Sequence, residues 1–74
     1  MTKQKRIEFL KLKLTEEIVA IIVDEMGCSI EEAFSRLYDS HTYARLSDPN
    51  TQLYMQSPGY VYSLLEEELS NTSY

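Results

Sequence analysis

The spacing of apolar residues between positions 5 and 26 constrains the fold of this chain more than any other feature. Intervals of three or four residues separate Ile7, Leu10, Leu14, Ile18 and Ile21, the pattern of one buried helix face. A second set of apolar positions widens this stripe: Phe9, Leu12, Val19, Val23 and Met26. Gly27 follows, where a glycine in the left-handed conformation commonly ends a helix. The pattern predicts one long helix over residues 5–26.

The segment LKLKL at residues 10–14 allows a different interpretation. Its alternation of apolar and charged residues is typical of a half-buried strand, and Thr15 would then cap a shorter helix. A strand requires a partner, and the other strand-like piece is residues 53–55. We therefore favour the long helix and keep a strand over residues 6–14 as the alternative. Because the long helix is apolar on more than one face, we expect a second chain to bury part of it.

Three serines mark the starts of further helices. Ser29 with Glu32 forms a capping box, Ser40 can cap a short helix over residues 41–46, and Ser57 precedes Pro58 at a first helical position. The expected apolar positions of the helix after Ser29 are Ile30, Ala33, Phe34, Leu37 and Tyr38, and those of the last helix are Val61, Leu64, Leu65 and Leu69.

The connection between these helices is predicted to begin with a turn. Pro49 pre-sets the backbone between Asp48 and Asn50, whose side chains favour turns, and residues 51–56 are expected to be extended or irregular. Acidic residues 66–68 lie near the end of the last helix, where negative charge fits the helix dipole poorly. We therefore expect something basic to hold them. Residues 71–74 read as a frayed tail.

Together these signals predict one all-α domain over residues 1–70, a small bundle of three or four helices with a long first helix. The expected core comprises Ile7, Leu10, Leu14, Ile18, Ile21, Ile22, Ala33, Phe34, Leu37, Leu46, Val61, Leu64 and Leu65.

A chain of 74 residues buries a modest core, so small domains commonly need a disulfide, a metal or a partner chain. The single cysteine, Cys28, cannot form an internal disulfide, and the single histidine, His41, does not provide a zinc motif. The remaining source of extra stability is association with another protein chain. We expect that chain to be a second copy or a different protein.

Charge is distributed unevenly along the chain. Residues 1–13 hold five basic residues and one acid, a net charge of +4, whereas the remainder holds two arginines and eleven acids, a net charge of −9. An acidic body repels phosphate backbones, so nucleic-acid binding is disfavoured. The basic start is followed by FLKLKL rather than by an apolar signal core, and the longest apolar run is residues 18–23. We expect a cytoplasmic protein with a reduced thiol and no membrane contact.

A helix-turn-helix DNA-binding regulator is the alternative function, because a helix, Gly27 and a second helix have suitable spacing. The exposed face of that second helix would carry three acids, Glu31, Glu32 and Asp39, against one base, Arg36. This face would repel DNA.

The sequence lacks a recognisable catalytic constellation, and we predict that the protein is not an enzyme. His41 has Asp39, Ser40 and Tyr43 nearby, but these residues also serve as caps and turn formers. Cys28 is expected to be a partly buried packing thiol. The acidic pairs do not match a calcium loop, and two separated glycines cannot form a phosphate loop. We therefore predict no catalytic residue, no cofactor, no metal and no small-molecule ligand.

Tyrosines are concentrated between residues 38 and 62. Four of them, Tyr43, Tyr54, Tyr60 and Tyr62, are too many for a small core in which every hydroxyl needs a partner. One hypothesis is that they pack an irregular segment against the first two helices. The other is that they form a partner-binding surface, since tyrosine is enriched at interfaces.

The segment over residues 29–69 resembles a group of short bacterial helical proteins. They share a capped IEEA helix, a Y-[DN]-S-x-T-Y-x-x-L segment, a D-x-x-T-x-L-Y turn, and S-P-x-Y-V-Y-x-L-L before an acidic end. In this chain the motifs are residues 30–33; residues 38–40 with Thr42, Tyr43 and Leu46; Asp48 with Thr51, Leu53 and Tyr54; and residues 57–58 with Tyr60, Val61, Tyr62, Leu64 and Leu65. The group is similar to small proteins encoded beside ADP-ribosyltransferase-like toxin genes. The resemblance implies an accessory or antitoxin-like binding role.

The leading hypothesis is therefore a non-catalytic protein-binding module of bacterial type, which self-associates or pairs with another chain. Surplus apolar and tyrosine surface favours it.

Overall fold

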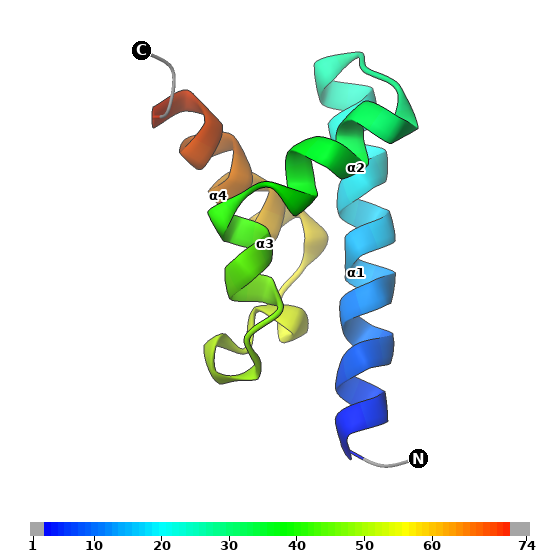
Figure 1. Ribbon diagram of the computed structural model, residues 1–74, viewed down its shortest axis with the longest axis vertical. Coiled ribbons are helices and arrows are strands. Elements are labelled where there is room, and N and C mark those ends of the chain that lie inside the picture. Colours follow the sequence, from blue (N-terminus) through cyan, green and yellow to red (C-terminus); the bar gives the residue numbers. More distant parts are fainter. Residues whose placement is uncertain (1–2, 72–74) are drawn as a thin grey trace.

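The computed structural model describes residues 3–71, which form four α-helices and two 3₁₀ turns. Their bounds are α1 Lys3–Met26, α2 Ile30–Tyr38, α3 His41–Leu46, η1 Pro49–Thr51, η2 Leu53–Met55 and α4 Pro58–Asn71. In Figure 1, α2 crosses the upper end of α1, and α3, α4 and the 3₁₀ turns lie to its left. The predicted all-α fold with a long first helix is confirmed.

The first helix is continuous. Residues 10–14, which also fitted a strand, lie inside α1, and residues 53–55 form η2, so the strand interpretation is wrong. Gly27 has φ +62°, and its N–H donates to the Val23 carbonyl at 3.0 Å, as expected for a glycine that ends a helix. Because α1 has 24 residues, it is about 36 Å long and spans most of the 41 Å long axis of the molecule.

The three predicted serine caps are confirmed. Each serine hydroxyl accepts a hydrogen bond from the N–H three residues later: Glu32 to Ser29 at 3.1 Å, Tyr43 to Ser40 at 3.0 Å, and Tyr60 to Ser57 at 3.2 Å. The capping box is completed differently from the usual form, since the Ser29 hydroxyl lies 3.3 Å from the Glu32 carboxylate. These local bonds fix where α2, α3 and α4 begin.

The segment expected to be extended or irregular, residues 51–56, is more regular than predicted. Asp48 accepts the Asn50 N–H at 3.0 Å, which confirms the turn, and Pro49 then begins η1. Gln52 has φ +56°, a left-handed conformation that separates η1 from η2. The Thr51 hydroxyl donates to the Arg45 carbonyl at 2.6 Å and so ties η1 to α3. Leu53 is thereby delivered into the core.

The core lies between the inner side of α1 and the other elements. Eight of the predicted core residues are buried: Leu14, Ile18, Ile22, Ala33, Leu37, Leu46, Val61 and Leu65. Five predicted core residues are half-buried: Ile7, Leu10, Ile21, Phe34 and Leu64. Three residues join the core without having been predicted: Val19, Leu53 and Tyr62. Ile7 and Leu10 remain partly accessible, since they line hollows next to the short turns that follow α3.

The end of the chain was predicted as a frayed tail over residues 71–74. Helix α4 includes Asn71, and residues 72–74 lie outside the described residues. Within residues 3–71, every helix is too short or too polar to cross a lipid bilayer.

Replacing Ile18 with alanine tests the position of the core. Ile18 is fully buried, so the Ile18→Ala variant should lose about 2–5 kcal/mol of unfolding free energy through lost burial and a cavity. Urea denaturation followed by circular dichroism measures this loss. As a control, Met55 is 68% exposed, and Met55→Ala should change the unfolding free energy by less than about 0.5 kcal/mol. Equal effects at the two positions would contradict the described core.

Candidate functional site

Glu68 connects the end of α4 to the start of α3. Its carboxylate accepts hydrogen bonds from the backbone N–H groups of His41 and Thr42 and from the Thr42 hydroxyl, all at 2.8 Å. These N–H groups belong to the first turn of α3, where backbone N–H groups lack acceptors within the helix and the helix dipole favours negative charge. The acidic end of α4 was expected to meet something basic. For Glu68 the partner is the N-terminus of another helix.

The same bonds change the acidity of Glu68. Partial burial raises the pKa of this carboxyl, but the hydrogen bonds from His41 and Thr42, together with the charge of a protonated His41, lower it by more. The pKa of Glu68 therefore lies below its ordinary value of 4.5. The arrangement fixes α3 against α4 and has a structural role.

The residues considered for acid–base chemistry are used as caps. The Ser40 hydroxyl accepts from Tyr43 and donates to the Leu37 carbonyl, and His41 contributes its backbone N–H to Glu68. The side chain of His41 is exposed. Among residues 3–71, no three His, Cys, Asp or Glu side chains lie close enough together to hold a metal ion.

Cys28 is half-buried and packs against the core, as predicted for a packing thiol. Its Sγ atom lies 4.0 Å from the carbonyl oxygen of Ile22, the distance of a weak S–H hydrogen bond.

The four tyrosines predicted as a binding surface lie in different environments. Tyr62 is buried in the core, and burial, followed by the charges of Glu66 and Glu25, raises the pKa of its hydroxyl. Tyr60 is 50% exposed. It lies two positions before Tyr62 on α4, and residues two positions apart on a helix point to nearly opposite sides. Tyr43 and Tyr54 are half-buried and pack against the core. Tyr60 is thus the most exposed of the four tyrosines.

An aromatic ladder joins α2 to α3. The ring of Tyr38 lies 5.4 Å from Phe34 and 4.8 Å from Tyr43, the second contact edge to face. The Lys11 ammonium of α1 lies 5.7 Å from the centroid of Tyr43 and 3.5 Å from the Ser47 hydroxyl. These contacts assign Tyr43 to packing between α1, α2 and α3.

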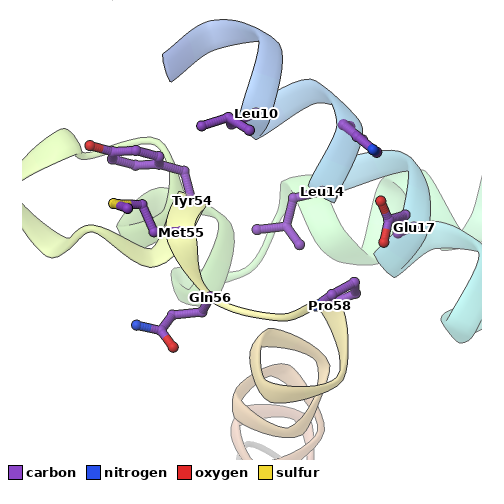
Figure 2. A pocket seen from close by; sticks show the side chains of 8 residues that line it. Leu10, Leu14, Glu17, Tyr54, Met55, Gln56 and Pro58 are labelled. Atoms are coloured by element: carbon purple, nitrogen blue, oxygen red, sulfur yellow. The ribbon is translucent and has the colours of Figure 1, made fainter. Parts of the chain in front are cut away.

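Tyr54 borders a shallow hollow of about 290 Å³ beside α1. Figure 2 shows Leu10 and Leu14 of α1 facing η2, with Tyr54 and Met55 on one side and Pro58 at the start of α4 on the other. Lys13 and Glu17 also line it. The lining thus combines apolar and charged side chains, and Gln56 completes it.

The strongest surface feature is a second apolar side of α1. We call it the outer face and define it as Phe9, Leu12, Ala20 and Val23 of α1 with Ile30 and Phe34 of α2. At 100° per residue the four α1 positions lie about 120° to 180° around the helix from the buried Ile18. Phe9 is 57% exposed, Leu12 58% and Ile30 61%. Within residues 3–71, they are among the most exposed large apolar side chains.

A recess lies on the outer face between the two helices. This α1–α2 hollow has a volume of about 390 Å³ and is lined by Glu16, Val19, Ala20, Val23, Ile30 and Phe34. A second depression, lined by Phe9, Leu12, Lys13 and Glu16, continues it toward the N-terminus of α1. The outer face is therefore an exposed aromatic ring followed by a largely apolar recess.

Sequence reasoning indicated surplus apolar positions on α1, among them Phe9, Leu12 and Val23, but did not indicate Ala20 or the two α2 residues of this surface. Apolar residues on two sides of one helix indicated that α1 needs cover beyond its own chain. Ile30 was assigned to the apolar stripe of α2, yet it is mostly exposed. Ile30 lies in the first turn of α2, three residues after the glycine that ends α1. This position could have indicated that the apolar stripe of α2 begins outside the core.

The chain matches no protein-family model, no curated protein and no solved structure.

The capping role of Glu68 predicts a specific pH dependence. Because its folded pKa is lowered, its contribution to stability is present above about pH 4.5 and is lost as the pH falls through the folded pKa. The Glu68→Gln variant should lose about 1 kcal/mol of unfolding free energy at pH 7, since neutral hydrogen bonds replace charge-assisted ones. Its stability should then fall less steeply than that of the wild type below pH 4.5. Thermal unfolding from pH 7 to pH 3 measures both.

The control for this experiment is the adjacent acid. Glu67 is exposed, so Glu67→Gln should leave the unfolding free energy at pH 7 within about 0.5 kcal/mol of the wild type. If Glu67→Gln and Glu68→Gln gave identical pH profiles, the capping role of Glu68 would be refuted.

Proposed function

We propose that this chain is a non-catalytic protein-binding module, which self-associates or pairs with another chain through the outer face. The observation that supports it most directly is the α1–α2 hollow with its exposed apolar rim. Soluble monomers rarely expose contiguous apolar patches larger than a few hundred Å², and aromatic side chains are enriched at protein interfaces.

The local structure of α1 favours the same role. Its inner side is covered by α2, α4 and η2, while Phe9 and Leu12 of the outer face are more than half exposed. Covering both sides of α1 would increase apolar burial in a chain too short for a large core. We therefore place the protein, as part of the proposal, among small cytoplasmic chains completed by a protein partner. The resemblance to short bacterial proteins encoded beside toxin-like genes adds one candidate for a different partner, an ADP-ribosyltransferase-like toxin.

DNA recognition through α2 receives less support. The acids that would approach a DNA groove are Glu31 and Glu32 of α2 and its C-cap Asp39, and all three are exposed. The basic residue of this helix, Arg36, contacts residues of its own chain. Its guanidinium lies 4.0 Å from the Glu32 carboxylate and 3.1 Å from the Met26 sulfur. No observation favours a helix-turn-helix role enough to propose it as a second function.

Introducing a charge on the outer face tests the proposal. Leu12 is 58% exposed, so Leu12→Asp should preserve the fold while weakening partner or self-binding more than about tenfold, because a charge at the centre of an apolar interface is left desolvated. Light scattering over a range of concentrations measures self-association. A pull-down with a tagged chain measures retention of a different protein.

Two controls define the surface. Met55 is 68% exposed on η2, outside the outer face, so Met55→Asp should bind as the wild type does. Tyr60→Ala tests the tyrosine surface separately, since Tyr62→Ala would remove a buried ring and destabilise the fold. A wild-type chain that stays monomeric at every concentration and retains no protein sensitive to Leu12→Asp would refute the proposed function.

A further inference from the structure

The outer face carries both an exposed aromatic ring and a recess. Phe9 is 57% exposed on the N-terminal half of α1, and the α1–α2 hollow lies on the C-terminal half. The α1 residues that line the hollow are centred about ten residues from Phe9, which corresponds to about 16 Å along the helix. Two copies related by a two-fold axis can therefore place each Phe9 in the hollow of the other copy. Such self-complementarity is the geometry of a symmetric dimer.

Charge along α1 selects the orientation of the two helices. Residues 3–13 hold five basic residues and one acid, a net charge of +4, and residues 14–26 hold four acids and no base, a net charge of −4. A parallel pair would place basic against basic and acidic against acidic. An antiparallel pair places each basic half beside an acidic half, which favours association.

One antiparallel register satisfies several contacts together. Arg6, Lys13, Glu17 and Asp24 are exposed and lie along one flank of the outer face, as their spacing on a helix requires. When Lys13 of one copy lies opposite Glu17 of the other, Arg6 lies opposite Asp24. In this register Phe9 lies over the turn that contains Ala20 and Val23, within the lining of the hollow.

Glu16 lies near the two-fold axis of this arrangement. Each Glu16 then has Lys13 of the other copy beside it, so the acid at the centre of the interface is compensated by a base. Lys13 and Glu16 line one depression on a single chain, which places both at the surface that the second copy would cover.

We propose that this protein forms a symmetric dimer in which two α1 helices lie antiparallel through their outer faces, each Phe9 filling the α1–α2 hollow of the other copy. The inference rests on the proposed binding function and names its partner as a second copy of the chain. A different protein in the same recess is an alternative that the experiments below separate.

Disulfide cross-linking tests the orientation. In a Cys28→Ser background, one variant carries Arg6→Cys and another carries Asp24→Cys. Positions 6 and 24 of one helix are about 27 Å apart, whereas a disulfide requires Cα atoms within about 7 Å. The oxidised mixture should form a cross-linked dimer at least tenfold faster than either variant alone. Faster cross-linking of the separate variants would indicate a parallel pair and overturn the proposal.

A collision control accompanies the cross-linking. Arg45 is exposed on α3, away from the outer face, so a mixture of Arg45→Cys with Asp24→Cys should cross-link no faster than random encounter. Equal rates for this mixture and the Arg6→Cys mixture would also overturn the proposal.

Charge reversal tests the complementarity independently. The double variant Arg6→Glu with Lys13→Glu, and the double variant Glu17→Lys with Asp24→Lys, should each have a dimer dissociation constant raised more than about tenfold. Mixing the two should restore a heterodimer, and the quadruple variant should restore the homodimer. Sedimentation equilibrium measures these constants, and circular dichroism confirms that each variant is helical. Loss of dimerisation that neither mixing nor the quadruple variant restores would refute the charge pairing.

The failure of the dimer and the failure of the binding function give different results. A wild-type monomer that binds a different protein, with binding lost in Leu12→Asp and kept in Met55→Asp, would refute the dimer and leave the module standing. A monomer that binds no such protein would refute both.

Discussion

The structure depends on the burial of the inner side of α1. Ile18 and Ile22 are fully buried, and α2, α4 and η2 all pack against this side. Helices of nine and six residues, such as α2 and α3, are too short to be stable alone in water, so tertiary contact must hold them. Helix α1 supports α2 directly, and it supports α3 through α2, α4 and η2. The apolar spacing of residues 5–26 therefore determines where everything else in the chain can lie.

Helix α3 is held less by α1 than by its contacts with α4 and the turns that follow it. Glu68 is central to this attachment. A carboxylate near the C-terminus of a helix is unfavourable for that helix, and here the same carboxylate satisfies donors at the N-terminus of another. Thr42 is buried and contributes both its N–H and its hydroxyl, so the polar contact is continuous with the core. One interaction thus gives a favourable environment to an acid near the C-terminus of α4 and provides acceptors for free N–H groups at the N-terminus of α3.

Local features of the sequence predicted the helix starts well, and long-range features were predicted poorly. Ser29, Ser40 and Ser57 act on N–H groups three residues away, so nearby residues contain the whole interaction. The partner of Glu68 is more than twenty residues distant, and no local pattern identifies it. The same limitation applies to Tyr60 and Tyr62. They are the same residue type, and their burial differs because α4 packs with the side of Tyr62 toward the core. On the outer face, the α1 residues were visible as surplus apolar positions, whereas the contribution of Ile30 depends on how α2 crosses α1.

Val19 belongs to two environments, which links the stability of the chain to the occupancy of its surface. It is a buried member of the core and also lines the α1–α2 hollow. Any partner that fills the hollow binds the folded chain and not the unfolded one, so mass action raises the population of the folded state. Dilution of the partner would have the opposite effect and increase the fraction of chains that open long enough for proteases to cleave them. The lifetime of this protein in a cell would then report how much of its partner is present.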